Sequence, residues 1–295
     1  DAEDIIQRIH YARSDHKGHH KPNELIHLRK EALEEARRFK EVAHRIEEAI
    51  LDNSLELNFQ PIYSFEKNRI TSLEVLSRLK DGKHNYINPE YFIHVAEINH
   101  TIIQLSRQMF EKTCRFAVDN NIFDRGINDM NINISPIQCQ DKHLVQDLKK
   151  IAAKYGIPFE RFHFEITESR LTDEKAVRET LTKLKENGAK IALDDFGTGY
   201  SNIASIMLMP IDFVKIDKSL LWSYASGDNE FLNELMPMIR GEGKKIIAEG
   251  IETEEHIEIL RRMGGDFLQG YYYSKPLNEE NFIRFLDARN NGAEA

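Results

Sequence analysis

The apolar residues of this chain follow one period before residue 55 and another after it. In residues 20–51 they recur at helical spacing between charges of both signs, and no Gly interrupts the stretch. This pattern predicts a long exposed helix. We expect a shorter helix and a polar loop in residues 1–20.

From Leu55 onward, short runs rich in β-branched and aromatic residues alternate with amphipathic stretches. Strands are expected at residues 55–64, 70–77, 130–135, 162–168, 190–195, 213–217, 245–250 and 266–270. Helices are expected at residues 101–120, 142–155, 174–187, 228–241 and 253–263. Strand and helix in alternation predict βα units and a largely parallel sheet, and eight strands over roughly 240 residues can close into a barrel.

The first two expected strands are separated only by SFEKNR, residues 64–69. Because this connection is too short for a crossover helix, the two strands should pair antiparallel. The prediction is therefore an α/β fold, a (β/α)8 TIM-like barrel with an antiparallel first strand, preceded by an N-terminal helical segment. An open doubly wound sheet is the competing architecture, but no Gly-rich phosphate loop follows an early strand. The expected division is residues 1–48 as helical segment and linker, and 49–295 as the barrel.

The composition is that of an ordinary globular protein, with 295 residues, 41% hydrophobic and 30% charged. Cys114 and Cys139 cannot form a disulfide framework or a C-x-x-C site, which favours a reducing cytoplasm. There is no apolar run of roughly 20 residues and no signal-peptide pattern, so a soluble segment is expected. The net charge of −9 argues against binding of a nucleic-acid polymer. Because the sequence begins at Asp1 without Met, we expect the natural protein to continue upstream. That upstream part could contain a sensor domain or a membrane anchor.

Six of the expected strands carry a polar residue at or near the carboxyl end, where the active sites of such barrels lie. These residues are Glu74, Asn133, Glu165 with Glu168, Asp194 with Asp195, Lys215 with Asp217, and Glu249. One such residue alone is more often a helix cap or a salt-bridge partner. Several carboxylates buried together would lose hydration and repel one another unless cations lay among them. Mg²⁺ and Mn²⁺ prefer oxygen ligands, so convergence of the strands predicts a metal site.

The ligand types narrow the chemistry of this expected site. Oxygen ligands with one Lys and no His or Cys point to phosphate chemistry rather than zinc-type hydrolysis. Two ions about 3.5–4 Å apart can activate a water, shield a phosphodiester and stabilise the departing alkoxide. Adjacent Asp194 and Asp195 suit a metal bridge, although an ordinary strand-end turn explains that pair equally well when it is considered alone.

Eight motifs in order resemble the EAL-domain cyclic-di-GMP phosphodiesterases over about residues 50–290. They are QPI at 60–62, EVLSR at 74–78, NIS at 133–135, EITE at 165–168, DDFGTGYS at 194–201, KID at 215–217, AEGIET at 248–253 and QGYYYSKPL at 269–277. The name-giving triplet reads Glu74-Val75-Leu76, in which Val replaces Ala but the Glu is kept. A second departure is Glu97-Ile98-Asn99-His100, where the family often has Glu-x-x-Gly.

This resemblance implies a metal-dependent phosphodiesterase that hydrolyses cyclic di-GMP to linear pGpG, lowers a bacterial second messenger and uses two Mg²⁺ or Mn²⁺ ions. The implied metal residues are Glu74, Asn133, Glu165, Asp194, Asp195 and Glu249. The implied catalytic residues are Lys215, which orients the attacking water, Asp195, which assists as base, and Glu168, which steadies the loop containing Gly197 and Gly199. The implied substrate residues are Gln60, Arg78, Gln269 and Glu252. The family also implies a homodimer formed through this domain.

The alternative is a receptor that binds cyclic di-GMP without cutting it. Degenerate members of the family that act this way lack a metal residue or the DDFG pair, and this chain lacks none of them, which favours hydrolysis. A barrel enzyme for another phosphodiester is a third hypothesis. Finally, AEDIIQRIHYARSDHKG at residues 2–18 resembles the last helix and tail of a GGDEF-type domain. We therefore expect a sensory or GGDEF-like domain upstream.

Overall fold

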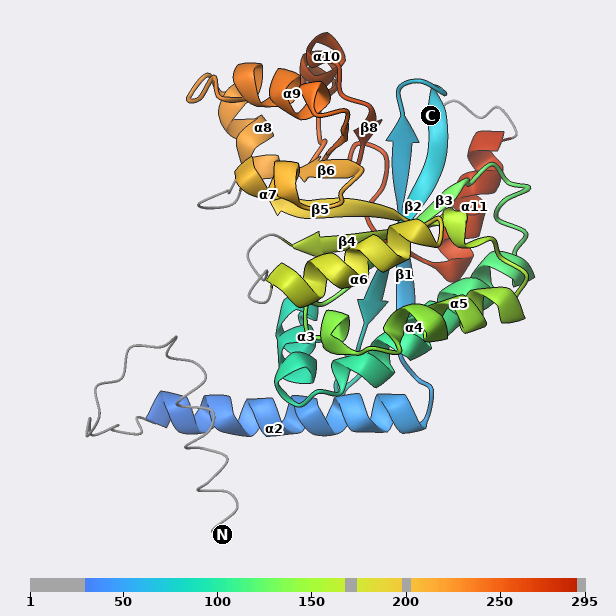
Figure 1. Ribbon diagram of the computed structural model, residues 1–295. Helices are drawn as coiled ribbons and strands as arrows, with labels where there is room; N and C mark the ends of the chain where they lie inside the picture. Colours follow the sequence, from blue (N-terminus) through green and yellow to red (C-terminus); the bar gives the residue numbers. More distant parts are fainter. Residues whose placement is uncertain (1–29, 168–173, 198–202, 291–295) are drawn as a thin grey trace. The chain divides into compact units, whose positions relative to one another are not determined.

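The computed structural model describes residues 30–167, 174–197 and 203–290 (Figure 1). The helix and loop expected in residues 1–20, and the GGDEF-like tail with them, lie outside these ranges. The chain divides into two units, one of Asp1–Ser54 with Leu79–Thr101 and the other of Leu55–Arg78 with Ile102–Ala295.

The first unit contains the long N-terminal helix α2, Lys30–Leu51. Val42, Ile46 and Ala49 follow one another at helical spacing and are buried. The predicted helix is confirmed from Lys30 onward. It was expected to be exposed, but these three buried residues show that one side of α2 is covered.

A second helix of the same unit, α3, spans Pro89–Ile98 and was not expected from the sequence. The side chain of Asn88 accepts a hydrogen bond from the backbone N–H of Glu90, and Pro89 occupies the first helical position, so two strong start signals coincide. Helix α3 contacts α2, and the guanidinium of Arg38 lies 4.6 Å from the ring centre of Tyr91.

The second unit is a closed barrel. Its strands are β1 (Glu56–Ser64), β2 (Arg69–Arg78), β3 (Asp129–Asn133), β4 (Phe162–Thr167), β5 (Lys190–Phe196), β6 (Phe213–Ile216), β7 (Lys245–Ala248) and β8 (Phe267–Leu268). Pairing runs from β2 in sequence order to β8, then to β1, and β1 pairs with β2 to close the ring. Strands β2 to β8 are parallel, whereas β1 is antiparallel to both of its neighbours. The predicted barrel is confirmed, and the open sheet is excluded.

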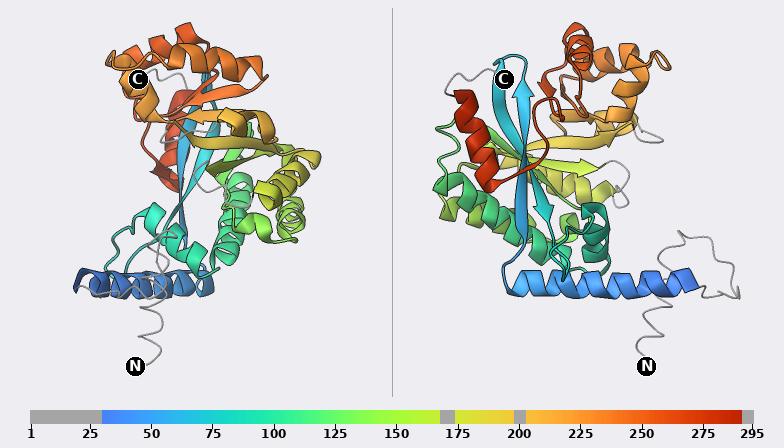
Figure 2. Two further views of the ribbon diagram at one scale, coloured as in Figure 1. Left: turned by 60° about the vertical axis from the view of Figure 1, so that its left-hand side comes forward. Right: turned by 180° about the vertical axis from the view of Figure 1, so that it is seen from behind.

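Helices lie outside this ring of strands (Figures 1 and 2). The expected ones are α4 (Ile102–Asp119), α5 (Leu144–Lys154), α6 (Glu174–Glu186), α9 (Leu232–Gly241) and α10 (Glu254–Met263). Elements not expected are α7 (Ile203–Leu208), α8 (Lys218–Ala225), the short strand β9 (Leu277–Asn278), α11 (Glu279–Asn290) and the 3-10 turns η1 (Gln138–Gln140) and η2 (Phe159–Arg161). Among the described helices, none combines the length and apolar character needed to cross a membrane.

The inside of the barrel is layered. Ile62, Ala192, Phe213 and Ile247 form a buried cluster against which Phe267 packs. We call these five residues the apolar layer. Side chains two positions apart on a strand face the same side, so the next layer toward the carboxyl ends of the parallel strands should begin two residues away. At that distance lie Gln60, Asp194, Lys215, Glu249 and Gln269. The apolar layer therefore supports a polar layer at the mouth of the barrel.

Candidate active site

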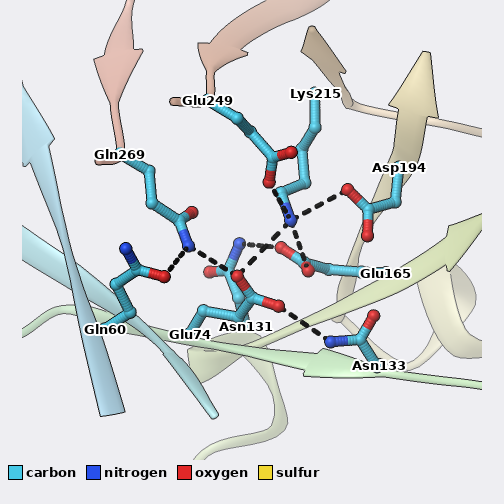
Figure 3. A network of polar contacts seen from close by, with 9 residues as sticks. All are labelled: Gln60, Glu74, Asn131, Asn133, Glu165, Asp194, Lys215, Glu249 and Gln269. Atoms are coloured by element: carbon cyan, nitrogen blue, oxygen red, sulfur yellow. Dashed lines mark hydrogen bonds and ion pairs between the residues drawn. The ribbon is translucent and has the colours of Figure 1, made fainter. Parts of the chain in front are cut away.

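Nine polar side chains from β1 to β8, or from the residue that follows a strand, meet at the mouth of the barrel (Figure 3). They are Gln60, Glu74, Asn131, Asn133, Glu165, Asp194, Lys215, Glu249 and Gln269. All were expected at a site except Asn131. The parallel register brings them together, because Glu74 pairs with Asn131, and Asn133 pairs with Glu165. We call these nine residues the polar cluster.

The ammonium group of Lys215 lies in the middle of four carboxylates. Its Nζ atom is 2.8 Å from Glu165 Oε2, 2.8 Å from Glu249 Oε1, 2.9 Å from Asp194 Oδ1 and 3.5 Å from Glu74 Oε2. The side chain is only 1% exposed. Burial alone would lower the pKa of Lys215, but the surrounding carboxylates raise it well above its ordinary value. Lys215 is therefore a fixed positive charge within the polar cluster.

One ammonium does not neutralise this set of acids. Burial raises the pKa of Glu249 to about 8, and the charges of Asp194 and Glu74 add to that effect while Lys215 opposes it. Burial also raises the pKa of Glu165 well above its ordinary value, again against the pull of Lys215. Protons are therefore retained at this site near neutral pH unless another cation replaces them.

Glu74 differs because it is surrounded by donors. Burial would raise its pKa, but Lys215 and hydrogen bonds from Gln269 and Asn133 hold it below the ordinary value. The Nδ2 of Asn133 donates to Glu74 Oε1 at 2.9 Å, and the Nε2 of Gln269 donates to Glu74 Oε2 at 2.6 Å. Both oxygens of Glu74 are thus oriented by neutral amides.

A backbone irregularity aims Asp194 and Asp195 at the same region. Consecutive residues of a regular strand point to opposite faces. The pairing of β5 with β6 shifts register between Leu193 and Phe196, and Asp195 has a left-handed φ of 55°. Carboxylate oxygens of Asp194, Asp195 and Glu249 consequently lie within 4.8 Å of one another. Burial and the nearby charge of Asp194 raise the pKa of Asp195 to about 6.

Gln60 and Gln269, both expected to contact substrate, are held by the protein. Gln269 Nε2 donates to Gln60 Oε1 at 3.1 Å as well as to Glu74, and Gln60 Nε2 donates to the carbonyl oxygen of Ser274 at 3.3 Å. The two glutamines therefore link the end of β8 to β1 and β2. Their contact with substrate stays a prediction.

Gly270 explains why the residue after Gln269 has no side chain. A Cβ at this position would lie 2.2 Å from both the backbone N and O of Ile251. The loops that follow β7 and β8 are joined there, because Ile251 N–H donates to the carbonyl of Gln269 and Tyr272 N–H donates to that of Ile251. This close backbone approach fixes Gln269 beside Glu249 at neighbouring strand ends.

Two of the expected substrate residues lie outside the polar cluster. Arg78 is the last residue of β2, is half-buried and donates from Nη1 to the carbonyl oxygen of Ser77. Glu252 is exposed in the loop before α10. Glu168 and Gly199 lie outside the described residues, so no structural statement applies to them.

Asn131 was missed at the sequence level although a signal existed. It stands two positions before Asn133 in the run Met-Asn-Ile-Asn-Ile-Ser, so both amides lie on the inward face of β3. Its Nδ2 donates to Glu165 Oε1 at 2.6 Å. Reading the strand in steps of two would have added this residue to the site.

The residues present fit hard divalent cations. Their donors are carboxylate and amide oxygens, the ligands that such ions prefer. Four carboxylates surround one ammonium, which leaves negative charge uncompensated in a buried place. Divalent cations would supply the missing positive charge and release the protons held by Glu249 and Glu165.

Comparison with known families and proteins agrees with this arrangement. A family model described as the EAL domain matches residues 43–276. The chain is 32% identical to Signaling protein YkoW of Bacillus subtilis over 82% of this chain and 30% of that protein. It is 28% identical to Cyclic di-GMP phosphodiesterase NbdA of Pseudomonas aeruginosa over 84% of this chain and 32% of that protein. The chain spans about a third of the length of these two curated relatives.

Solved structures give the same fold. The EAL enzyme Bd1971 in its form bound to cAMP and cyclic di-GMP superposes with a TM-score of 0.77 at 26% identity, over 87% of this chain and 71% of that one. The PaMucR phosphodiesterase in complex with c-di-GMP superposes with a TM-score of 0.73 at 28% identity, over 82% of this chain and 99% of that one.

Proposed function

Because this chain belongs to the EAL domain family, we propose that it is a metal-dependent phosphodiesterase that hydrolyses cyclic di-GMP to linear pGpG. The observation that carries the proposal is the polar cluster, in which carboxylates from β2, β4, β5 and the end of β7 surround Lys215. Support for the substrate comes from NbdA, which is named a cyclic di-GMP phosphodiesterase, and from the PaMucR phosphodiesterase, whose structure is a c-di-GMP complex.

In this proposal Glu74, Asn133, Glu165, Asp194 and Glu249 would hold two ions, Mg²⁺ or Mn²⁺, with Asp195 as a further ligand or a bridge. Bound there, the ions would supply positive charge that activates water and offsets the charge of the phosphodiester. Glu74 is suited to this task because Asn133 and Gln269 already fix its two oxygens. Little reorientation would then be needed on binding.

Lys215 would orient the attacking water and supply positive charge as negative charge develops on the phosphate. Its four carboxylate partners hold the ammonium protonated, so it would act by position and charge rather than by giving up its proton. A side chain held from several directions keeps its place during the reaction, which is the basis of electrostatic preorganisation.

Asp195 would accept the proton of that water. In the cation-free protein the pKa of Asp195 is about 6, so its carboxyl is mostly ionised at neutral pH and able to accept a proton. The left-handed backbone at this residue stores strain of a kind that recurs at functional positions. Glu168 would steady the loop after Asp195, and Gly197 with Gly199 would let that loop move.

Gln60, Arg78, Gln269 and Glu252 would contact the substrate. The guanidinium of Arg78 matches the geometry of a phosphate. We further propose that residues 1–48 form a linker and residues 49–295 form the phosphodiesterase barrel. The chain would form a homodimer through that barrel and act in the cytoplasm. In the whole protein a sensory or GGDEF-like domain would precede it.

The test is to incubate the chain with cyclic di-GMP and Mg²⁺ or Mn²⁺ and to separate the products by chromatography. We expect pGpG with either ion, none with EDTA, and a loss of at least about 100-fold in Asp194→Asn. Asp124→Asn is the matched control, because Asp124 is exposed in the turn before β3, away from the mouth. It should retain full activity.

The same experiment separates the alternatives. A chain that binds cyclic di-GMP but releases no product under any metal condition would be a receptor. A chain that cuts other phosphodiesters, and is not inhibited by cyclic di-GMP, would be a phosphodiesterase of different substrate class. Either result would refute the proposed function.

A further inference from the structure

Asn131 is a fully buried member of the polar cluster. It is 1% exposed, and its position on β3 is two residues before Asn133, one layer below the strand end. Its Nδ2 donates to Glu165 Oε1 at 2.6 Å, whereas its Oδ1 is buried and has no hydrogen-bond partner among the described residues. Figure 3 shows the amide directed into the cluster.

The layer beneath the strand ends is apolar on one side of the barrel and polar on the other. On β1, β5, β6, β7 and β8 the equivalent inward positions carry the apolar layer of Ile62, Ala192, Phe213, Ile247 and Phe267. On β2 and β4, which flank Asn131, they carry the buried polar residues Ser72 and His163. A buried amide oxygen without a partner is unfavourable, and an apolar side chain of similar size would avoid that cost. Packing alone therefore does not account for Asn131.

What Asn131 provides is a second donor to Glu165. That carboxylate is fully buried, with Oε2 bound by Lys215 at 2.8 Å and Oε1 bound by Asn131. Two donors on two oxygens fix both the position and the plane of the group. The amide adds no charge, so it orients Glu165 without competing with a cation for the negative charge of the site.

We propose that Asn131 is a positioning residue that holds Glu165 so that its Oε2 faces the other carboxylates and is ready to bind a divalent cation. This inference rests on the proposed function for the identity of the cation. Groups that orient metal ligands in this way are worth about 10- to 100-fold in metal affinity or activity when they are removed.

The test measures Mn²⁺ affinity directly, by calorimetry on the full chain without substrate. Asn131→Leu keeps the size of the side chain and removes the donor, and we expect Kd for Mn²⁺ to rise by about 10- to 100-fold. Thr113→Val is the matched control, because it also removes one buried hydrogen bond, from Thr113 Oγ1 to the carbonyl of Met109 in α4. It should leave Kd unchanged.

A double-mutant cycle tests whether Asn131 acts through Glu165. In a Glu165→Gln background the substitution Asn131→Leu should have little further effect on Kd, because the group that it positions is already altered. If Asn131→Leu does not fold, as judged by its thermal transition, Asn131→Ala replaces it throughout, since it demands no new volume.

The outcomes separate this inference from the proposed function. A Kd for Asn131→Leu within twofold of the wild-type value, or additive effects in the cycle, would overturn the positioning role. A wild-type chain that binds no Mn²⁺ would overturn it as well. If the wild-type chain binds Mn²⁺ but yields no pGpG, the proposed hydrolysis fails, and the measured Kd values still decide the role of Asn131.

Discussion

The Nζ atom of Lys215 lies 2.8 Å from Oε2 of Glu165, and both side chains are almost wholly buried inside the barrel. Burying such a pair is costly unless further partners surround it. Here the ammonium also contacts Asp194 and Glu249 within 2.9 Å, so the acids outnumber the base. This excess of negative charge is reduced when the carboxyls bind protons or cations. The stability of the barrel should therefore depend on pH and on the cations that it binds.

Replacing Lys215 with Met should destabilise the cation-free protein by about 3 kcal/mol or more, because carboxylates would remain buried without their ammonium partner. Saturating Mn²⁺ should restore part of this loss, since the ion brings its own positive charge. The measurement is Tm in EDTA and in Mn²⁺ for both proteins. An unchanged Tm in EDTA would show that Lys215 does not balance the polar cluster.

The cation-free barrel should lose stability as pH rises from about 5 to about 8. The folded pKa of Glu249 is about 8, above its ordinary value of 4.5, so the folded state binds more protons than the unfolded state between these limits. The expected loss is roughly 3–4 kcal/mol, because one pKa unit corresponds to about 1.4 kcal/mol. Thermal unfolding in EDTA across this range measures it. Glu249→Gln lacks the titrating group and should show a flatter profile, and equal slopes in both proteins would contradict this explanation.

Asp195→Gly should raise stability while abolishing activity. Glycine adopts a φ of 55° without the steric cost that Asp195 bears, a gain of about 1 kcal/mol, or a rise in Tm of roughly 2–4 °C. The proposed base is lost at the same time. Asp195→Asn tolerates the left-handed region about as well as Asp, so it should lose activity without the gain in Tm. A lower Tm for the glycine variant would show that the backbone here is not strained.

Asp129→Asn should stabilise the protein above pH 6 and have little effect near pH 4. Burial raises the pKa of Asp129 to about 6, so ionisation of this carboxyl disfavours the folded state as pH rises through that value. We expect the free energy of unfolding of the variant to exceed that of the wild type by roughly 2–3 kcal/mol at pH 8. The neighbouring His163 titrates in the opposite sense, because burial lowers its pKa to about 4. Because His163 Nε2 lies 3.5 Å from Asp129 Oδ1, the effect of Asp129→Asn is measured in a His163→Gln background, where an equal effect at pH 4 and pH 8 would refute the assignment to Asp129.

Much of the barrel could be predicted from the sequence, because each buried parallel strand is a short apolar run between turn residues. The strand ends were less certain. The run KIIAEG predicts a strand to Gly250, but β7 ends at Ala248, since Gly250 has a φ of 66° and leaves the extended conformation. Helix α8 was missed because it begins directly after β6, with Asp217 accepting a hydrogen bond from Ser219 N–H, so that no loop separates strand from helix.

The polar cluster was predictable in its members and not in its geometry. Residues at strand ends could be named from Glu74 to Glu249 because a closed barrel brings strand ends together. The left-handed backbone at Asp195 and the central position of Lys215 depend on how β5 and β6 pair. The local sequence of either strand does not indicate that register. Asn131 was not predicted because it lies two residues before the end of β3, and only residues at strand ends were expected at the site.

Anomalous diffraction from crystals of this chain soaked with Mn²⁺ shows directly whether the polar cluster binds divalent cations. We expect anomalous peaks at the mouth of the barrel, within about 2.5 Å of carboxylate oxygens of Glu74, Glu165, Asp194 and Glu249. The opposite result would be Mn²⁺ peaks elsewhere on the protein but none among these four carboxylates, with Lys215 still ion-paired to all of them. That result would contradict a cation site at the mouth of the barrel.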